Sequence, residues 1–106
     1  MPARTAIRDG ENEVYVSAAS VWEIAIKHAL GKLPAGPLLD HASELLREQT
    51  FEELPVTVAH GVRAGALPLH HKDPFDRMLA AQAQAENLVI VSSDRVFDAY
   101  GIRRMW

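Results

Sequence analysis

Short apolar runs alternate with longer helical patterns along the whole chain. The most strand-like stretch is 88–92, whose unbroken apolar character predicts a strand buried on both faces, as in a parallel sheet. Three further strands are predicted at 13–17, 54–57 and 102–106.

Helices are predicted between these strands. The clearest begins after Ser17, a typical N-cap, and ends at Gly31, and its apolar residues recur at helical spacing. Another begins with the capping Asp73 and with Pro74, and it ends at Asn87. The remaining helical stretches are 2–7, 37–49, 58–67 with Thr57 as its cap, and a short turn over 95–99.

Strands that alternate with helices predict an α/β domain. Right-handed crossovers place helices on both faces of a mainly parallel sheet, which gives three layers. We therefore expect a single three-layer α/β domain over residues 1–106, with Trp22 and Trp106 as anchors of its core.

Composition limits the possible functions. The chain has no cysteine, so it forms neither disulfides nor thiolate metal sites, and a reducing cytoplasm is its natural setting. Its net charge is 11 − 14 = −3, which excludes the broad basic surface of proteins that bind nucleic acid by charge alone. No apolar run approaches the ~20 residues that span a bilayer. A nucleic-acid role would have to act locally, for example through a bound cation.

The acidic residues fall into two sets when they are sorted by the predicted strands. Ligands of open α/β sheets gather beyond the carboxyl ends of the strands. Four acids precede strands and so belong to the opposite edge: Glu11, Glu13, Glu52 and Glu53. Four others follow a strand or lie early in a helix, and we expect them to face one edge: Glu23, Asp73, Asp76 and Asp94. Converging carboxylates repel one another unless a cation holds them, and an all-oxygen set suits Mg²⁺ or Mn²⁺.

Each of these four acids also has a purely structural interpretation. Asp73 is placed to cap its helix, and Asp94 to cap the short turn after it. Asp76 would be favoured in a first helical turn by the helix dipole. Glu23 precedes Lys27 by four residues, the spacing of an exposed ion pair. Pattern alone therefore leaves the structural and the metal-binding interpretations open.

Three segments in this order resemble a known family: residues 16–24, VSAASVWEI; residues 73–83, DPFDRMLAAQA; and residues 91–94, VSSD. Together they resemble PIN domains, and more narrowly the VapC-type toxins of bacterial toxin–antitoxin modules. The resemblance runs over nearly the whole chain. It implies a ribonuclease that depends on Mg²⁺ or Mn²⁺.

The resemblance also assigns site residues by position. Glu23 matches the acid of a Ser-x-x-Glu segment, Asp76 the acid that opens an Asp-x-x-Leu-Ala-Ala helix, and Asp94 the acid after the penultimate strand. It implies that Asp76 and Asp94 hold the ion, while Glu23 holds a metal-bound water or acts as a base. Three basic residues beside these acids are candidates for contacting phosphates: Lys72, Arg77 and Arg95.

The chain departs from the family pattern at its start. Family members open with an apolar strand that ends in an aspartate, whereas this sequence begins at the following helix, 2–7. A misassigned or truncated start predicts that the native protein is a full nuclease, and a genuine short form predicts a weakened or inactive one. Without that central strand, the edges of 13–17 and 88–92 must pair directly, take a partner's strand or stay open.

The same resemblance also implies partners, and it leaves rival functions open. The resemblance implies an RNA substrate, a cognate antitoxin and a homodimer. The alternative is a non-catalytic protein that keeps the scaffold for gripping an antitoxin or a second subunit. A third interpretation, a receiver-type domain in which Asp94 accepts a phosphoryl group, is disfavoured because no lysine follows Lys72.

Overall fold

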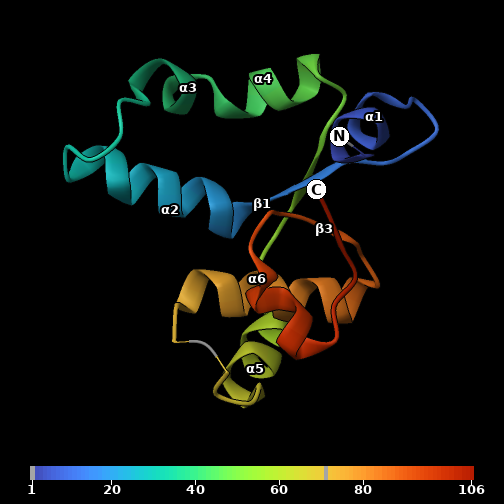
Figure 1. The fold of residues 1–106 in the computed structure, drawn as a ribbon. Helices are drawn as coiled ribbons and strands as arrows, with labels where there is room; N and C mark the ends of the chain where they lie inside the picture. Colours follow the sequence, from blue (N-terminus) through green and yellow to red (C-terminus); the bar gives the residue numbers. More distant parts are fainter. Residues whose placement is uncertain (1, 71) are drawn as a thin grey trace. The chain divides into compact units, whose positions relative to one another are not determined.

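The computed structural model describes residues 2–70 and 72–106, which form two compact units (Figure 1). The terminal unit comprises the chain up to Asn12 and from Val56 onward, and the inserted unit runs from Glu13 to Pro55. Helices alternate with short strands, and both strand pairs are parallel, which confirms the predicted α/β class.

The inserted unit pairs its first and last segments and fills the space between with helices. Strand β1 (Tyr15–Ser17) lies parallel to β2 (Glu52–Leu54), with Tyr15 opposite Glu52. The helices between them are α2 (Ala18–Ala29), α3 (Gly36–Asp40) and α4 (Ala42–Glu48). The hydroxyl of Ser17 accepts a hydrogen bond from the amide of Ala19 at 3.1 Å, so the predicted cap of α2 is confirmed.

Two predictions for the inserted unit are wrong. The expected single helix over 37–49 is two helices, because His41 leaves the helical conformation (φ −129°). The Nδ1 of its ring donates a hydrogen bond to the carboxylate of Glu44 at 3.0 Å. Strand β2 lies two residues earlier than 54–57, since Pro55 has no amide hydrogen to continue a ladder. Glu52 and Glu53 therefore lie within a strand and not before it.

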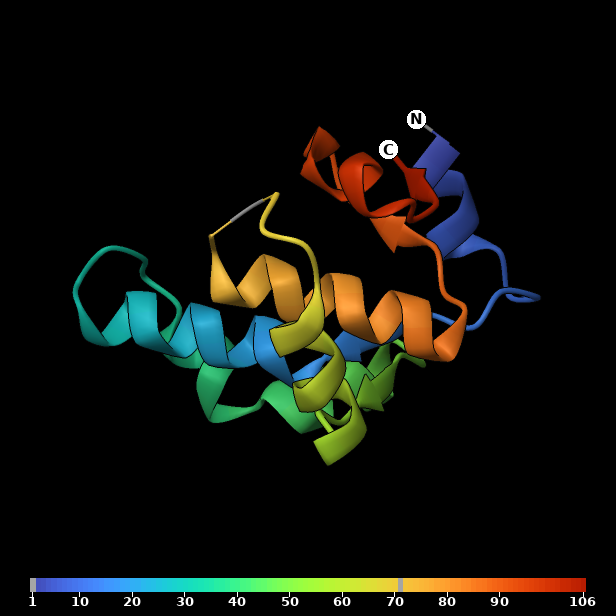
Figure 2. The same cartoon turned by 90° about the horizontal axis from the view of Figure 1, so that it is seen from below.

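The terminal unit contains the remaining elements. These are α1 (Pro2–Arg8), α5 (Val58–Ala66), α6 (Pro74–Glu86), β3 (Ile90–Val91), the 3₁₀ helix η1 (Arg95–Tyr100) and β4 (Arg104–Met105). Helix α5 packs along α6, which also contacts β3 and η1. Helix α1 lies beside the C-terminal end of the chain in both Figure 1 and Figure 2.

Local signals set the helix ends of this unit as predicted. Thr57 caps α5 through a capping box with His60, and Asp73 caps α6 with Pro74 in its first turn. Helix α6 ends at Asn87, whose φ of 55° is left-handed and so stops the helix.

The hydrophobic core of the terminal unit lies between α6, η1 and the start of β4. Its fully buried members are Ala80, Ala83, Phe97 and Ile102. Small alanines on α6 let η1 approach closely, and the Phe97 ring fills the space between them. Trp22 and Trp106 are 62% and 53% exposed, so the prediction that they anchor the core is wrong.

Strand β3 is shorter and more open than its sequence predicts. Its amides bond to β4 through Ile90 and Ser92. Val89 and Val91 are 42% and 45% exposed, so the expected burial on both faces is wrong. Over the described residues β1 pairs with β2 and β3 with β4, in two separate two-stranded sheets. Direct pairing of β1 with β3, one of the three outcomes expected for these edges, is not observed among these residues.

Among the helices in the described part of the chain, none combines the length and the apolar character needed to cross a membrane.

Replacing Phe97 with alanine should lower the free energy of unfolding by about 3–5 kcal/mol, because it removes a 3% exposed ring and leaves a cavity beside Ala80. Urea denaturation measures this change. Val58→Ala on α5 is the control, since Val58 is 85% exposed and should change stability by less than about 0.5 kcal/mol. Equal effects of the two substitutions would contradict this account of the core.

Candidate functional site

The first turn of α6 carries two of the predicted acids. The carboxylate of Asp73 accepts hydrogen bonds from the amides of Phe75 at 2.8 Å and Asp76 at 3.3 Å, so it caps the helix. Asp76 is partly buried one turn into α6, where the helix dipole favours a negative charge. The structural interpretation of Asp73 is confirmed.

Arg77 follows Asp76 and points back toward the end of α5. Its Nη2 donates to the carbonyls of Ala64 at 2.9 Å and Leu67 at 3.1 Å, and its Nη1 donates to the carbonyl of Pro68 at 3.1 Å and the hydroxyl of Tyr100 at 3.4 Å. The guanidinium is thus turned toward the chain's own oxygens. The prediction that Arg77 contacts phosphates has no support in this geometry.

Asp94 begins η1, immediately after β3. Its amide donates to the hydroxyl of Ser92 at 3.0 Å, and its carboxylate accepts from the amide of Val96 at 2.9 Å. Asp94 therefore caps η1, as its structural interpretation predicts, while its side chain stays at the surface.

An ion pair holds the segment that follows Asp94. Arg104 donates to both carboxylate oxygens of Asp98, from Nε at 3.1 Å and from Nη2 at 3.3 Å, and also to the carbonyl of Ser92 at 3.1 Å. Hydrogen bonding to Arg104 lowers the pKa of Asp98 below its ordinary value. Desolvation opposes this lowering, and the charges of Arg104 and Arg95 add to it. The hydrogen bond to Asp98 in turn raises the pKa of Arg104 above its ordinary value, and the charges of Asp98 and Asp94 add to this effect.

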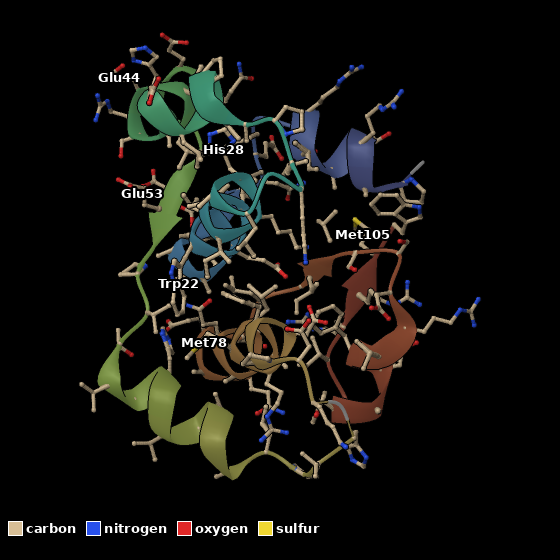
Figure 3. The ribbon with its side chains drawn as sticks, turned by 90° about the vertical axis from the view of Figure 1, so that its left-hand side faces the viewer. Trp22, His28, Glu44, Glu53, Met78 and Met105 are labelled. Atoms are coloured by element: carbon tan, nitrogen blue, oxygen red, sulfur yellow. The ribbon has the colours of Figure 1, made fainter. Side chains whose placement is uncertain are left out.

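Glu23 lies on α2 in the inserted unit. Its carboxylate forms an ion pair with Lys27 at 3.5 Å, and its side chain is 27% exposed. The predicted i,i+4 pair is therefore present. Trp22, the preceding residue, and Glu53 on β2 are labelled in Figure 3.

The structure thus brings Asp73, Asp76 and Asp94 into one unit and places Glu23 in the other. Asp76 and Asp94 open two helices, α6 and η1, that pack against each other. Across residues 2–70 and 72–106, no group of three or more His, Asp or Glu side chains is close enough to hold a metal ion. The donors at these positions are all carboxylate oxygens, which are the ligands that a hard divalent ion prefers.

The inserted unit also contains an apolar cleft of about 480 Å³ over the β1–β2 pair. Its walls come from the start of α2, from α4 and from β2, and the lining residues are Val16, Ala18, Val21, Ala42, Ser43, Leu46, Glu53, Leu54 and Pro55. Ser43 donates a hydrogen bond to Glu53 at 3.3 Å, so the cleft has one polar pair among its apolar side chains.

Two polar contacts are not predicted by the sequence. His60 is 2% exposed, and its ring bonds to Glu86 of α6 at 2.8 Å and to the amide of Thr57 at 3.1 Å. The Thr57-x-x-His60 spacing is a local signal for the capping box, but nothing local links His60 to Glu86. The Asp98–Arg104 pair likewise depends on the turn at Gly101, whose φ is 70°.

Comparison with known proteins decides the family. Residues 1–102 match the PIN domain, and so the match spans both units. The chain belongs to the PIN domain family. This confirms the resemblance inferred from the segments around Glu23, Asp76 and Asp94.

A similar curated relative of this PIN domain is "Ribonuclease VapC16" of Mycobacterium tuberculosis. It is 40% identical over 58 residues, which are 54% of the chain and 41% of that relative. The match thus spans about two fifths of the relative's length.

The Asp98–Arg104 pair should make stability pH-dependent in acid. Because folding lowers the pKa of Asp98 below its ordinary value of 3.8, the unfolded chain binds more protons there, and the stabilisation is present above about pH 4 and is lost as pH falls through the folded pKa. Urea titrations from pH 3 to 7 should show wild type and Asp98→Asn converging in stability below about pH 4. Asp40→Asn, at the exposed end of α3, should follow wild type at every pH. If the difference in the free energy of unfolding between wild type and Asp98→Asn stayed constant from pH 3 to 7, the acid dependence would not come from Asp98.

Proposed function

We propose that this PIN domain is a VapC-like RNA endonuclease that hydrolyses phosphodiester bonds with the aid of Mg²⁺ or Mn²⁺. The observation that carries the proposal is the family match over residues 1–102. The name of the similar relative, a ribonuclease, supports RNA as the substrate. The placement of Asp76 and Asp94 at the starts of two packed helices supports a site in the terminal unit.

Asp76 and Asp94 are the residues that would hold the ion. Both residues carry a carboxylate at the beginning of a helix. Asp76 is partly buried and Asp94 is exposed, so neither side chain belongs to the buried core. When bound, a divalent ion lowers the pKa of a water and neutralises charge that develops on phosphate. The chain's part is to place the two residues: the amide of Val96 orients the Asp94 carboxylate, and the Asp73 cap holds the backbone of the turn that carries Asp76.

For Glu23, in the inserted unit, the proposal keeps the role that the family resemblance implies. Its role, to hold a water or to act as a base, rests on its match to the Ser-x-x-Glu segment of the family. Its ion pair with Lys27 is exposed enough to exchange for another partner at little cost. Of the basic residues beside the acids, Lys72 and Arg95 are exposed and remain the candidates for phosphate contact.

Asp76→Asn should reduce RNA cleavage at least ~100-fold, because it removes a charged ligand while preserving the shape of the side chain. RNA cleavage is measured with Mg²⁺ and with Mn²⁺ for two parent proteins. One is the 106-residue chain, and the other carries an N-terminal extension encoded by the in-frame upstream codons. Asp73→Asn is the matched control, since asparagine caps a helix as well as aspartate does, and it should stay within a few-fold of its parent. Equal cleavage by a parent and its Asp76→Asn variant, or no cleavage by either parent, refutes the proposed activity.

The apolar cleft of the inserted unit supports a second part of the proposal, the docking of an antitoxin segment. Its volume, about 480 Å³, is in the range of sites that take a few side chains, and its walls are apolar around the Ser43–Glu53 pair. A segment that inserts apolar side chains and donates a hydrogen bond to Glu53 would fit this cleft. Binding there without RNA cleavage is the rival function, a non-catalytic antitoxin-binding PIN domain.

Leu46→Glu should weaken binding of the protein encoded by the adjacent reading frame by ~100-fold or more, because it places a charge in the cleft wall. Isothermal titration calorimetry with that purified protein measures the change. Leu38→Glu is the matched control, since Leu38 is 46% exposed on α3 and does not line the cleft. Equal loss in both variants would show that the segment does not dock in the cleft.

A homodimer is the last part of the proposal. Helix α5 leaves Val58 and Val62 85% and 70% exposed, one turn apart, and the space around Gly61 and Gly65 is open. An apolar helix face of this kind supports self-association about a two-fold axis, in which the same patch serves both subunits.

A further inference from the structure

We infer that Arg77 is a positioning residue of the proposed nuclease site, which sets the place of Asp76 by fastening the first turn of α6 to the end of α5 and to η1. The inference rests on the proposed function. It assigns Arg77 a role within the chain, in place of the phosphate contact that its position beside Asp76 predicts.

The geometry around the guanidinium carries the inference. Its two Nη atoms have four N–H bonds, and the structure places four acceptors on them: the carbonyls of Ala64, Leu67 and Pro68 and the hydroxyl of Tyr100. These acceptors come from α5, from the loop after it and from η1. One planar group thus joins three segments to α6.

The carbonyl of Ala64, in the last turn of α5, needs such a donor, whereas that of Pro68 also accepts a hydrogen bond from the amide of His70 at 2.9 Å. Helix α5 ends at Ala66, and Leu67 leaves the helical conformation with ψ 145°, so the last carbonyls of α5 have no amide within the helix. A cation at a helix C-terminus is favourable, and a fork of parallel N–H groups satisfies several oxygens at once. Lysine, with a compact charge and no fixed plane, cannot hold the same set.

Asp76 is coupled to this fastening through the backbone. Arg77 is its neighbour, and the amide of Arg77 donates to the carbonyl of Asp73 at 3.1 Å, while the amide of Asp76 donates to the Asp73 carboxylate. The segment after α5 contacts η1 a second time, because the rings of His70 and Tyr100 meet edge to face with their centroids 5.2 Å apart. A shift of the guanidinium therefore moves the turn that carries Asp76, and a displacement of about 1 Å can cost ~100-fold in rate.

Arg77→Lys tests the inference, with Arg103→Lys as its matched control. Arg103 also donates to a helix-end carbonyl, that of Asn87 at 3.3 Å, and to the Asn87 side chain at 2.9 Å, but it does so at the other end of α6. Both variants keep the charge, so a change confined to Arg77→Lys reports position and not net charge.

The first measurement is amide hydrogen exchange on the metal-free protein, which does not depend on activity. Arg77→Lys should accelerate exchange at the amides of Phe75 and Asp76 by ~10-fold or more, while Arg103→Lys leaves these amides unchanged. Unchanged exchange at both amides in Arg77→Lys overturns the inference, whatever the result for RNA cleavage.

The second measurement is RNA cleavage by the parent that is active in the Asp76→Asn experiment. Arg77→Lys should lower kcat by ~10–100-fold, leave KM for RNA within about two-fold, and raise the Mn²⁺ concentration needed for half-maximal rate. A raised KM with a weaker salt dependence and an unchanged kcat would assign Arg77 to phosphate contact and overturn the inference. If neither parent cleaves RNA, the proposed function and the catalytic part of this inference fail together, whereas the exchange result still decides whether Arg77 positions the turn.

Discussion

The terminal unit depends on one polar interaction, the set of hydrogen bonds that Arg77 donates to the end of α5 and to η1. The core of the terminal unit is small, and two of its four buried members are alanines, so apolar burial alone fixes the helices only loosely. The partly buried guanidinium of Arg77 donates to several carbonyls, and these bonds hold α5, α6 and η1 in one arrangement. Its effect reaches Asp76 because the two residues are adjacent on α6.

Acidic residues of the candidate site have structural roles at the starts of helices. Asp73 and Asp94 each accept backbone amides at the start of a helix, and Asp76 lies in the turn that Asp73 caps. Capping holds a carboxylate in one orientation without burying it, which leaves it accessible to a ligand. Local caps thus orient these helix starts, and the hydrogen bonds of Arg77 add the long-range contacts that fasten the turn of Asp76.

The strands explain why the apolar pattern of 88–92 was a poor guide to burial. Val89 and Val91 are substantially exposed because β3 pairs with one neighbour, β4, in a sheet of two strands. An apolar run indicates that a strand can be buried on both faces. Whether it is buried depends on how many other elements pack around it. Trp22 is a second example. Its helical spacing predicted a place on a buried face of α2, but the elements of the inserted unit leave its side chain largely exposed.

The sequence by itself determined the ends of several helices, because these depend on residues within a few positions of one another. Ser17, Thr57, Asp73 and Asn87 begin or end helices where their side chains or backbone preferences predict. It also determined the family, through the ordered segments that include Asp76 and Asp94. Only the tertiary structure decided the break at His41, the register of β2 and the partners of Arg77, Arg104 and His60. Those contacts join residues that are far apart along the chain or compete for the same acceptors, and no local preference specifies which of them will meet.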